Sequence, residues 1–422
     1  MCRLIILILL SLLAPYLVFT QELNTNTIHE KTLQLYQNKQ WKKLIEIGEK
    51  AQSQGMESYF LNYRMGVAYY EIKNYRKSAP YLEKALKRTP DDEVLLEYQY
   101  YAYLLGSQFE NLQIFLNELN PNIVKNKLKT NNTDIKKIFI NYANLKFNDY
   151  QIERPTNANS FNQRIRQDLY TASLGFSHRL GKSLILTHAF SILKGKHKLL
   201  NNNNQFFRDL QQNEYYLSAN IFVEKNTFLK LAFHYINSDL SSENTALEST
   251  SDSYVAFVGF KKNLSLVDLM ISVSYANLND GTQVQPNLNL NFFPNGNQNF
   301  YSNSQISFQF SKNDMLSKNE NGYYINQLFH FQPSPIMSIE IFGTLANIGN
   351  AITNDALVVF NDNDKINHSY GLTLGFWLFQ HSGFLYFTTK QDKYETTYFV
   401  NNTASNTNYK INSIIGGLSW YL

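Results

Sequence analysis

Seven histidines lie in the C-terminal two thirds of the chain, and two of them have a neighbour suited to acid–base chemistry. His188 is followed closely by Ser191, and His330 precedes Glu340. A serine beside a histidine can become a nucleophile, and a carboxylate can orient a histidine that acts as a general base. Catalysis of this kind needs a third orienting group, and the sequence places none beside either pair. We therefore predict that the chain is not an enzyme and has no catalytic residues.

No other pattern in the sequence points to a cofactor. The sequence has no metal-ligand spacing, no phosphate-binding loop and no nucleophile elbow. Cys2 is the only cysteine and precedes the apolar N-terminal segment, so we predict a mature chain without disulfides. The net charge of +4 is too small to indicate a nucleic-acid partner. We predict no cofactor, no metal and no nucleic acid.

The segments that carry these histidines alternate apolar and polar side chains, which is the period of a β-strand. The clearest example is residues 213–236, with the sequence NEYYLSANIFVEKNTFLKLAFHYI. Here Leu229, Leu231 and Phe233 alternate with Lys230 and His234. Each arm has about the nine to eleven residues that cross a bilayer at a tilt, and tyrosines near the ends suit a membrane–water boundary. The pattern predicts a hairpin of an outer-membrane β-barrel, with lipid as a partner.

Similar hairpins recur up to Leu422 and predict a transmembrane antiparallel barrel of about 14 strands over residues 136–422. An even number allows antiparallel closure, which leaves no unpaired edge in lipid. The alternative is a soluble β-sandwich with a helical cap, which fits the strand lengths less well. The candidate strands are 138–148, 169–180, 183–194, 213–223, 227–237, 252–262, 265–277, 285–293, 299–311, 321–332, 336–346, 368–379, 383–398 and 409–422.

Short and long connections alternate between these strands. Because barrels of this kind have short periplasmic turns and longer external loops, both ends of the barrel are expected on the periplasmic side. The expected long connections are 149–168, 195–212, 238–251, 278–284, 312–320, 347–367 and 399–408. Two of them, 149–168 and 347–367, are long enough to fold inward and close the pore.

Four polar side chains alternate with apolar neighbours and are predicted to line the lumen: Lys230, His234, His330 and Glu340. They serve either as the ordinary polar filling of a barrel or as part of a substrate path. About 14 strands lie between the eight whose interior is filled by side chains and the 16–18 of open channels, so we expect a narrow or loop-closed pore.

The N-terminus has the three parts of a secretory signal. Arg3 gives a positive start, residues 4–13 form an apolar core, and Pro15 interrupts it. We predict a signal peptide at residues 1–20 and a mature chain that starts at Gln21. An uncleaved membrane anchor is the alternative, and the apolar run is short for one.

Residues 25–126 repeat with a period of 34 residues. Trp41, Tyr75 and Phe109 keep this spacing and are expected to serve packing between helices. The middle unit, residues 59–90, resembles a tetratricopeptide repeat, and residues 127–135 are predicted to be a linker. The residues on the family's packing positions are Met65, Gly66, Tyr69, Tyr75, Leu82, Ala85 and Pro90.

The tetratricopeptide resemblance implies a short solenoid whose concave surface takes a partner. By this resemblance, Tyr63, Val67, Tyr70 and Tyr101 line that surface. Packing between helices is the alternative role for these four side chains. Acidic and basic residues are nearly balanced in this segment, so the groove has no evident preference for a charged ligand.

The fold class that follows is multi-domain α + β, a short all-α tetratricopeptide-like solenoid followed by a barrel. This order resembles outer-membrane proteins with periplasmic repeats, such as exopolysaccharide-export porins and surface-lipoprotein assembly modulators. The Asn-rich, aromatic-rich composition resembles that of Bacteroidetes proteins. The resemblance implies repeats in the periplasm that recruit a protein or polymer for export or surface assembly. Two alternatives remain, a non-transporting scaffold subunit and a diffusion porin for small solutes.

Overall fold

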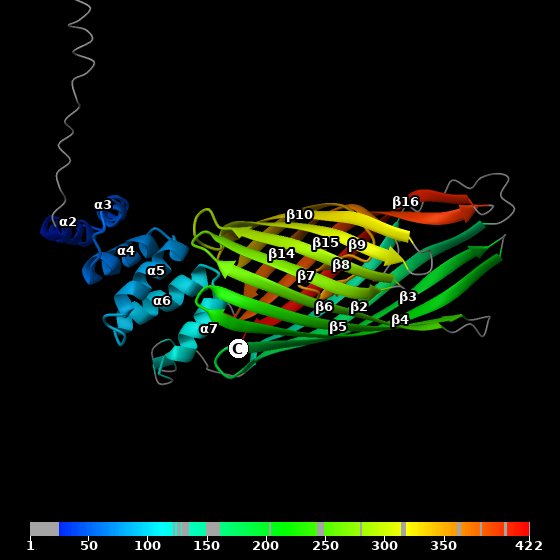
Figure 1. Ribbon diagram of the computed structural model, residues 1–422, viewed down its shortest axis with the longest axis horizontal. Helices are drawn as coiled ribbons and strands as arrows, with labels where there is room; N and C mark the ends of the chain where they lie inside the picture. Colours follow the sequence, from blue (N-terminus) through cyan, green and yellow to red (C-terminus); the bar gives the residue numbers. More distant parts are fainter. Residues whose placement is uncertain are drawn as a thin grey trace, which may run out of the picture.

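The computed structural model describes residues 25–120, 123–124, 128, 135–148, 161–201, 204–242, 249–278, 281–313, 318–360, 364–379, 382–400 and 403–421. The predicted signal peptide therefore lies outside the described residues, as does most of the predicted linker. Helices occupy the N-terminal part of the described chain, and a closed barrel occupies the rest (Figure 1). No helix among these residues is both long and apolar enough to span a membrane.

Six helices form three antiparallel pairs. Equivalent helices start 34 residues apart, and each pair is joined by a residue in the left-handed region, namely Lys39 (φ 54°), Lys73 (φ 63°) and Ser107 (φ 54°). This turn makes the chain reverse tightly before the second helix of each pair. The helices are α2 (Thr25–Gln37), α3 (Trp41–Ser53), α4 (Tyr59–Glu71), α5 (Tyr75–Leu86), α6 (Glu93–Leu105) and α7 (Phe109–Glu118).

Small residues set the spacing between these helices. A Cβ on Gly66 of α4 would lie 2.6 Å from a methyl of Leu82 in α5, so the two helices approach more closely than a side chain allows. Trp41 and Tyr75 are half-buried at the start of their helices, as the repeat pattern predicts. Phe109 is 46% exposed, which corrects the expectation that it serves packing. Phe109 is the first residue of α7, the second helix of the last pair, and no further helix pair follows it among the described residues.

Fourteen strands close into an antiparallel barrel in which β1 pairs with both β2 and β16. The sequence prediction of an α-solenoid followed by an antiparallel barrel of about 14 strands is confirmed. The strands are β1 (Ile135–Asn148), β2 (Phe161–Leu180), β3 (Leu184–Asn201), β4 (Asn204–Glu224), β5 (Thr227–Ser242), β6 (Ser249–Asn263), β7 (Val267–Leu278), β8 (Gly281–Phe292), β9 (Phe300–Asn313), β10 (Lys318–Ser334), β11 (Met337–Ile348), β14 (Lys365–Leu378), β15 (Gly383–Val400) and β16 (Thr403–Tyr421).

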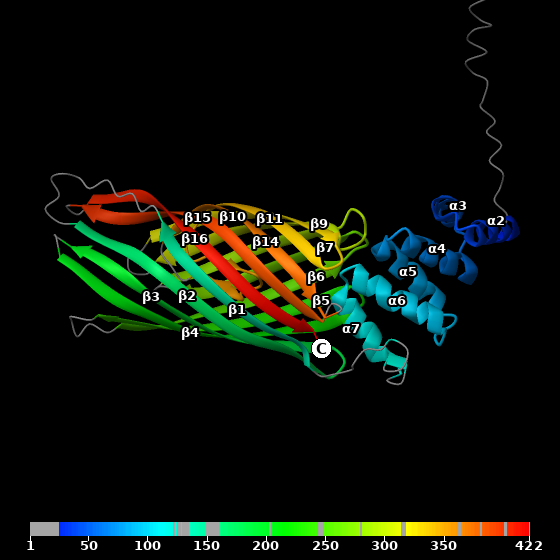
Figure 2. The same cartoon turned by 180° about the vertical axis from the view of Figure 1, so that it is seen from behind.

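Several connections predicted to be long loops are strand instead. β3 and β4 pair as far as Asn201↔Asn204, and β15 and β16 pair as far as Val400↔Thr403, so 195–212 and 399–408 are mostly tight hairpin. The physical reason is that the polar residues there still complete the backbone ladder without the apolar alternation that marks a membrane strand. These long strands project together beyond the shorter ones at the end away from the helices (Figure 2).

The two ends of the barrel differ. We call the end that carries the helices and the C-terminus the turn end, and the opposite one the far end (Figure 1). The two faces of the barrel strands differ as well. On β5, Leu231, Phe233 and Tyr235 are 40–44% exposed on the outside, whereas His234 and Ile236 are buried inside. An apolar outer band and a mixed interior follow from this alternation.

Candidate functional site

The connection between β11 and β14 turns into the barrel instead of away from it. We call residues 349–360 the inner loop; it contains the small hairpin of β12 (Ile352–Thr353) and β13 (Val358–Val359). At its tip Asn354, Asp355 and Ala356 have φ of 51°, 55° and 65°. Three successive non-glycine residues in the left-handed region are costly, so contacts with the barrel must hold this turn.

Polar side chains of β4 and β5 hold one side of the inner loop. Lys230 Nζ lies 2.5 Å from the Asp355 carboxylate, and the Tyr216 hydroxyl donates to the Asp355 carbonyl at 3.1 Å. His234 Nδ1 lies 2.8 Å from the Ala356 carbonyl, which requires the Nδ1–H tautomer for a hydrogen bond. The tip of the loop is thereby anchored to the barrel wall by one ion pair and two hydrogen bonds to its backbone carbonyls.

Amide side chains of β8 and β9 hold the backbone at the root of the loop. Gln285 donates to the Ile352 carbonyl at 2.6 Å and accepts from the Ile352 amide at 3.2 Å, as a neighbouring strand would. Gln283 donates to the Asn350 carbonyl at 2.9 Å, and Gln309 donates to the Gly349 carbonyl at 2.7 Å. The backbone of a loop inside a barrel has no neighbouring strand to pair with. These three glutamines supply hydrogen-bond partners for it instead.

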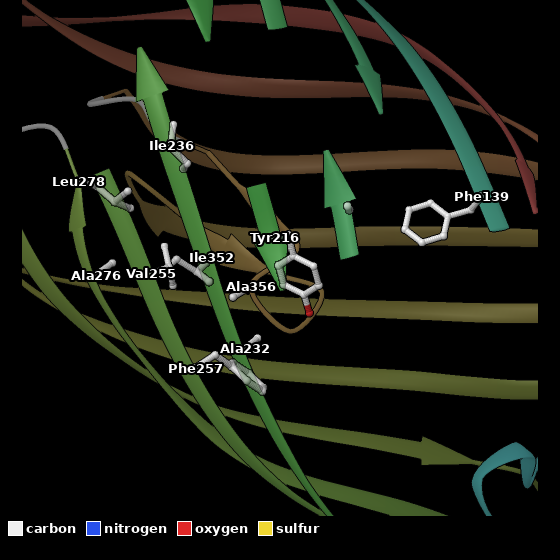
Figure 3. Close-up of a cluster of buried hydrophobic side chains, with 11 residues drawn as sticks. Phe139, Tyr216, Ala232, Ile236, Val255, Phe257, Ala276, Leu278, Ile352 and Ala356 are labelled. Carbon is white, nitrogen blue, oxygen red and sulfur yellow. The ribbon is translucent and has the colours of Figure 1, made fainter. Parts of the chain in front are cut away.

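Apolar residues of the loop contact opposite walls of the barrel. Ile352 and Ala356 join a buried cluster that includes Tyr216, Val255 and Phe257, drawn in Figure 3. Ala351 joins a second cluster on the other side, formed with residues of β11 and β14–β16 such as Tyr394, Tyr409 and Ile411. Because it packs on both sides, the inner loop spans the lumen. The sequence indicated two loops as long enough for this, 149–168 and 347–367. Residues 349–360 of the second fold inward, and residues 149–160 of the first lie outside the described residues.

A cavity of about 460 Å³ lies in the lumen between the inner loop and the helices. Residues 352–356 border it on the loop side, and Glu110 of α7 borders it on the turn side. We call this space the chamber. Its wall between these borders is rich in amides from β8, β9 and β10, namely Asn287, Asn289, Asn291, Asn303, Gln305 and Asn326.

Arg76 of α5 fixes the helices to the barrel. Its guanidinium donates two parallel hydrogen bonds to Asp268 of β7, each 2.8 Å long, and the two side chains are 0% and 5% exposed. Arg76 Nε also donates to the Gly106 carbonyl at 2.7 Å, and its Cζ lies 3.6 Å from the ring centroid of Phe293. A paired, fully buried arginine of this kind makes a specific and rigid contact.

Further contacts follow the turns of the barrel. Glu110 of α7 pairs with Lys261 of β6 at 2.5 Å, and Asn111 donates to Asn226 in the β4–β5 turn at 2.6 Å. Asn297 in the β8–β9 connection donates to the Lys73 carbonyl at 2.9 Å. The helices α5–α7 therefore lie across one side of the turn end, beside the opening of the chamber.

The four residues predicted to line the lumen do not form one site. Lys230 and His234 hold the tip of the inner loop, and Lys230 also borders the chamber. His330 and Glu340 lie together near the β10–β11 turn, with 3.1 Å between His330 Nδ1 and the carboxylate, and Tyr301 is stacked on His330 at 4.4 Å. They do not border the chamber. The other pairing weighed from the sequence is not formed: His188 contacts Tyr215 and His178 at 2.9 and 3.2 Å, and its partner is not Ser191.

The four residues predicted to bind a partner differ in exposure. Val67 is 2% exposed, so its side chain cannot reach a partner in this structure, which corrects that part of the expectation. Tyr63 and Tyr70 are half-buried, and Tyr70 packs on Tyr98 at 4.8 Å. Burial raises the pKa of the Tyr63 and Tyr70 hydroxyls above the usual range, so both remain neutral. Tyr101 is 37% exposed and is the most accessible of the four.

Sequence reasoning missed the amides, Arg76 and Asp355. The amides had a signal, because every second residue of β8 from Gln283 to Asn291 is Gln or Asn. That alternation marks a polar inner face, and it becomes a site only when the loop and the helices enclose it. Arg76 and Asp355 had no sequence signal, since their partners come from distant segments.

No family model matches the sequence, and no curated protein matches it significantly. Among solved structures, a Pseudomonas aeruginosa FadL homologue is similar over 72% of this chain and 93% of its own, with 9% identity and a TM-score of 0.42. The Pseudomonas putida toluene transporter TodX is similar over 73% and 94%, with 6% identity and a TM-score of 0.45. The translocator domain of the autotransporter NalP from Neisseria meningitidis is similar over 69% and 90%, with 9% identity and a TM-score of 0.32. At these values the likeness indicates nothing about which solute or partner this chain handles.

Proposed function

We propose that this chain is an outer-membrane barrel whose lumen is a gated passage, closed in this structure by the inner loop. The observation that carries the proposal is that the inner loop spans the lumen while a polar chamber lies beneath it. A diffusion porin is disfavoured, since the loop lies across the path.

The location in a membrane is supported by the exposed apolar residues of the barrel. Large side chains such as Leu231, Ile271, Phe308 and Ile341 are 40–60% exposed on the outer face, where water would not favour them. The two longest connections between barrel strands, residues 149–160 and 349–364, join strand ends at the far end. Because long loops of such barrels are external, we infer that the helices lie in the periplasm and that the inner loop enters from outside.

Leu231→Arg is expected to reduce the yield of folded barrel far more than Lys230→Ala. Arginine in the lipid-facing band of a barrel costs about 2–4 kcal/mol near the midplane. Lys230 points inward to Asp355, so its truncation affects the inner loop and not the lipid contact. The measurement is the fraction of protein in outer membranes that shows a heat-dependent shift on a gel. Equal folded yields of the two variants would mean that the faces are assigned wrongly.

Asp355→Ala tests the gate. The substitution removes the partner of Lys230 at the loop tip and leaves a charged amine in the lumen, so the inner loop is expected to loosen. In vesicles reconstituted with the purified chain, glucose-driven swelling should be slow with the natural chain and several-fold faster with the variant. Asp239→Ala, which removes an exposed carboxylate near the far end, is the control and should leave the rate unchanged. Equal rates for Asp355→Ala and the natural chain would contradict a gate held by this loop.

We further propose that the helices recruit a periplasmic protein or polymer for export or surface assembly, through Tyr63, Tyr70 and Tyr101. Tyrosine suits an interface because its ring buries much area at little entropic cost and its hydroxyl still bonds. Tyr101→Ala is expected to keep the fold within about 0.5 kcal/mol, as exposed positions usually do, and to lose the co-purifying partner. Phe109→Ala, which removes another exposed aromatic side chain, is the control. Retention of the partner by Tyr101→Ala would remove the basis for this surface.

A non-transporting scaffold is the second candidate, and the buried Arg76–Asp268 pair favours it. This pair fixes the helices rigidly on the barrel, which suits a fixed platform for a complex. The two candidates differ in one result, because a scaffold predicts that no change in the inner loop makes the barrel permeable.

A further inference from the structure

We propose that the chamber binds one small neutral solute rich in hydroxyl groups, a polyol or a mono- or disaccharide. The inference deepens the proposed function, since it names the solute class for the passage and rests on the lumen being one. It comes from three features of the chamber, which are its charges, its amides and its volume.

All five charged residues that border the chamber already have a partner of opposite charge. Lys230 pairs with Asp355 at the loop, Lys261 pairs with Glu110 at the helices, and Asp268 pairs with Arg76. These pairs lie at the two ends of the chamber, and the amide wall lies between them. A charged solute would lose its water without gaining a free counter-charge, which is costly. The chamber therefore favours a neutral ligand.

The amide wall matches the chemistry of hydroxyl groups. Each Asn or Gln side chain offers a carbonyl acceptor and an NH₂ donor, and a hydroxyl group is likewise both donor and acceptor. Asn303 donates to both Asn289 and Asn291, at 2.8 and 2.7 Å, so the amides form an ordered row. An ordered row of alternating donors and acceptors is preorganised for a ligand with several adjacent hydroxyls.

Side chains of the same inward-facing row on β8 already bind a polar group in the lumen, namely the backbone of the inner loop. On β8, Gln283 and Gln285 bind the backbone of the inner loop, with Gln285 acting as donor and acceptor at once. Asn287, Asn289 and Asn291 continue this inward-facing row towards the turn end, below the loop. The loop occupies the upper part of the row, and the chamber leaves the lower part for a ligand.

The size of the chamber is the third feature. The volume of about 460 Å³ lies at the lower end of the range of about 300–1,000 Å³ for small-molecule sites, so the chamber suits one small solute at a time.

The test is equilibrium dialysis of the purified full chain in detergent against radiolabelled sucrose, gluconate and toluene, over a day to allow slow entry. We expect saturable binding of sucrose, and binding of gluconate and toluene at least about tenfold weaker. Absence of saturable sucrose binding, or binding of gluconate or toluene as tight as that of sucrose, would overturn the proposal.

Two variants and a control locate the binding. Asn289→Leu combined with Asn303→Leu should weaken sucrose binding at least about tenfold, because it removes two donor–acceptor groups. The control is Asn406→Leu, which removes an exposed amide of β16 at the far end of the barrel. This variant should bind sucrose as the natural chain does. If the double leucine variant does not fold, as judged by the heat-dependent gel shift, Asn289→Asp keeps the shape and adds a charge, and the same loss is expected. Unchanged sucrose binding in the variant that folds would contradict the site.

The failure of this proposal can be told from the failure of the passage. If Asp355→Ala speeds vesicle swelling and sucrose does not bind, the passage stands and the solute class is wrong. If Asp355→Ala has no effect and sucrose does bind, the chamber is a binding site in a closed barrel and the gate is wrong.

Discussion

Replacement of residues 349–360 by a short Gly/Ser linker is expected to turn a nearly non-conducting barrel into an open pore. The inner loop is packed on opposite walls and is the only segment of the described chain that we find across the lumen. A 14-strand barrel without it has an interior wider than the side chains of its wall can fill. The mean conductance per channel in a planar bilayer should rise by on the order of tenfold or more.

The control for the loop replacement is the same linker in place of residues 243–248, between β5 and β6. This control chain should conduct as little as the natural one, because the inner loop is intact. A loop-free chain that folds, as shown by its heat-dependent gel shift, yet conducts no more than the control would leave the scaffold as the better account.

Arg76→Ala is expected to release the helices from the barrel and to lower the free energy of unfolding by about 3–5 kcal/mol. This is the usual penalty for removing one partner of a buried ion pair. Asp268 would remain buried and unpaired, and Gly106 and Phe293 would lose their contacts with Arg76. Urea unfolding of the helices, followed by circular dichroism at a helical wavelength while the barrel stays folded, should show the loss as a lower midpoint.

The matched control for Arg76→Ala is Lys84→Ala, on the same helix. Lys84 pairs with Glu57 at 2.7 Å, but both side chains are about half exposed, so the change should cost about 0.2–1 kcal/mol. Arg76→Leu combined with Asp268→Leu should be less destabilising than Arg76→Ala alone, because no unpaired charge remains. A midpoint for Arg76→Ala equal to that of Lys84→Ala would show that the helices are not held by this contact.

The fold could be predicted because the membrane and the repeat each impose a period on the sequence. Lipid on one side of a strand forces apolar residues at every second position, and this identified all 14 strands, as in Leu229–Phe233 of β5. The 34-residue period of Trp41, Tyr75 and Phe109 gave the first residues of α3, α5 and α7. Strand ends at the far end were missed, since water on both faces removes the alternation.

The candidate site could be predicted only in part. The length of the 347–367 connection indicated a closing loop, and Lys230 was expected in the lumen, but its partner Asp355 lies in a loop whose path the sequence does not encode locally. Arg76 has the local context of an exposed arginine on a helix, and its partner Asp268 is 192 residues away. Such contacts join segments that are far apart in the sequence, so no local periodicity marks them.

The central claim is that the chamber beneath the inner loop is closed from the far end by that loop, and cysteine accessibility tests it most directly. Asn289→Cys, in a chain with Cys2→Ser so that no other thiol is present, places one thiol in the chamber wall. Intact cells would be treated with a membrane-impermeant thiol reagent, with the natural loop or with the linker in place of residues 349–360. The account predicts no labelling with the natural loop and rapid labelling with the linker. Labelling at the same rate in both chains, or in neither, would contradict it.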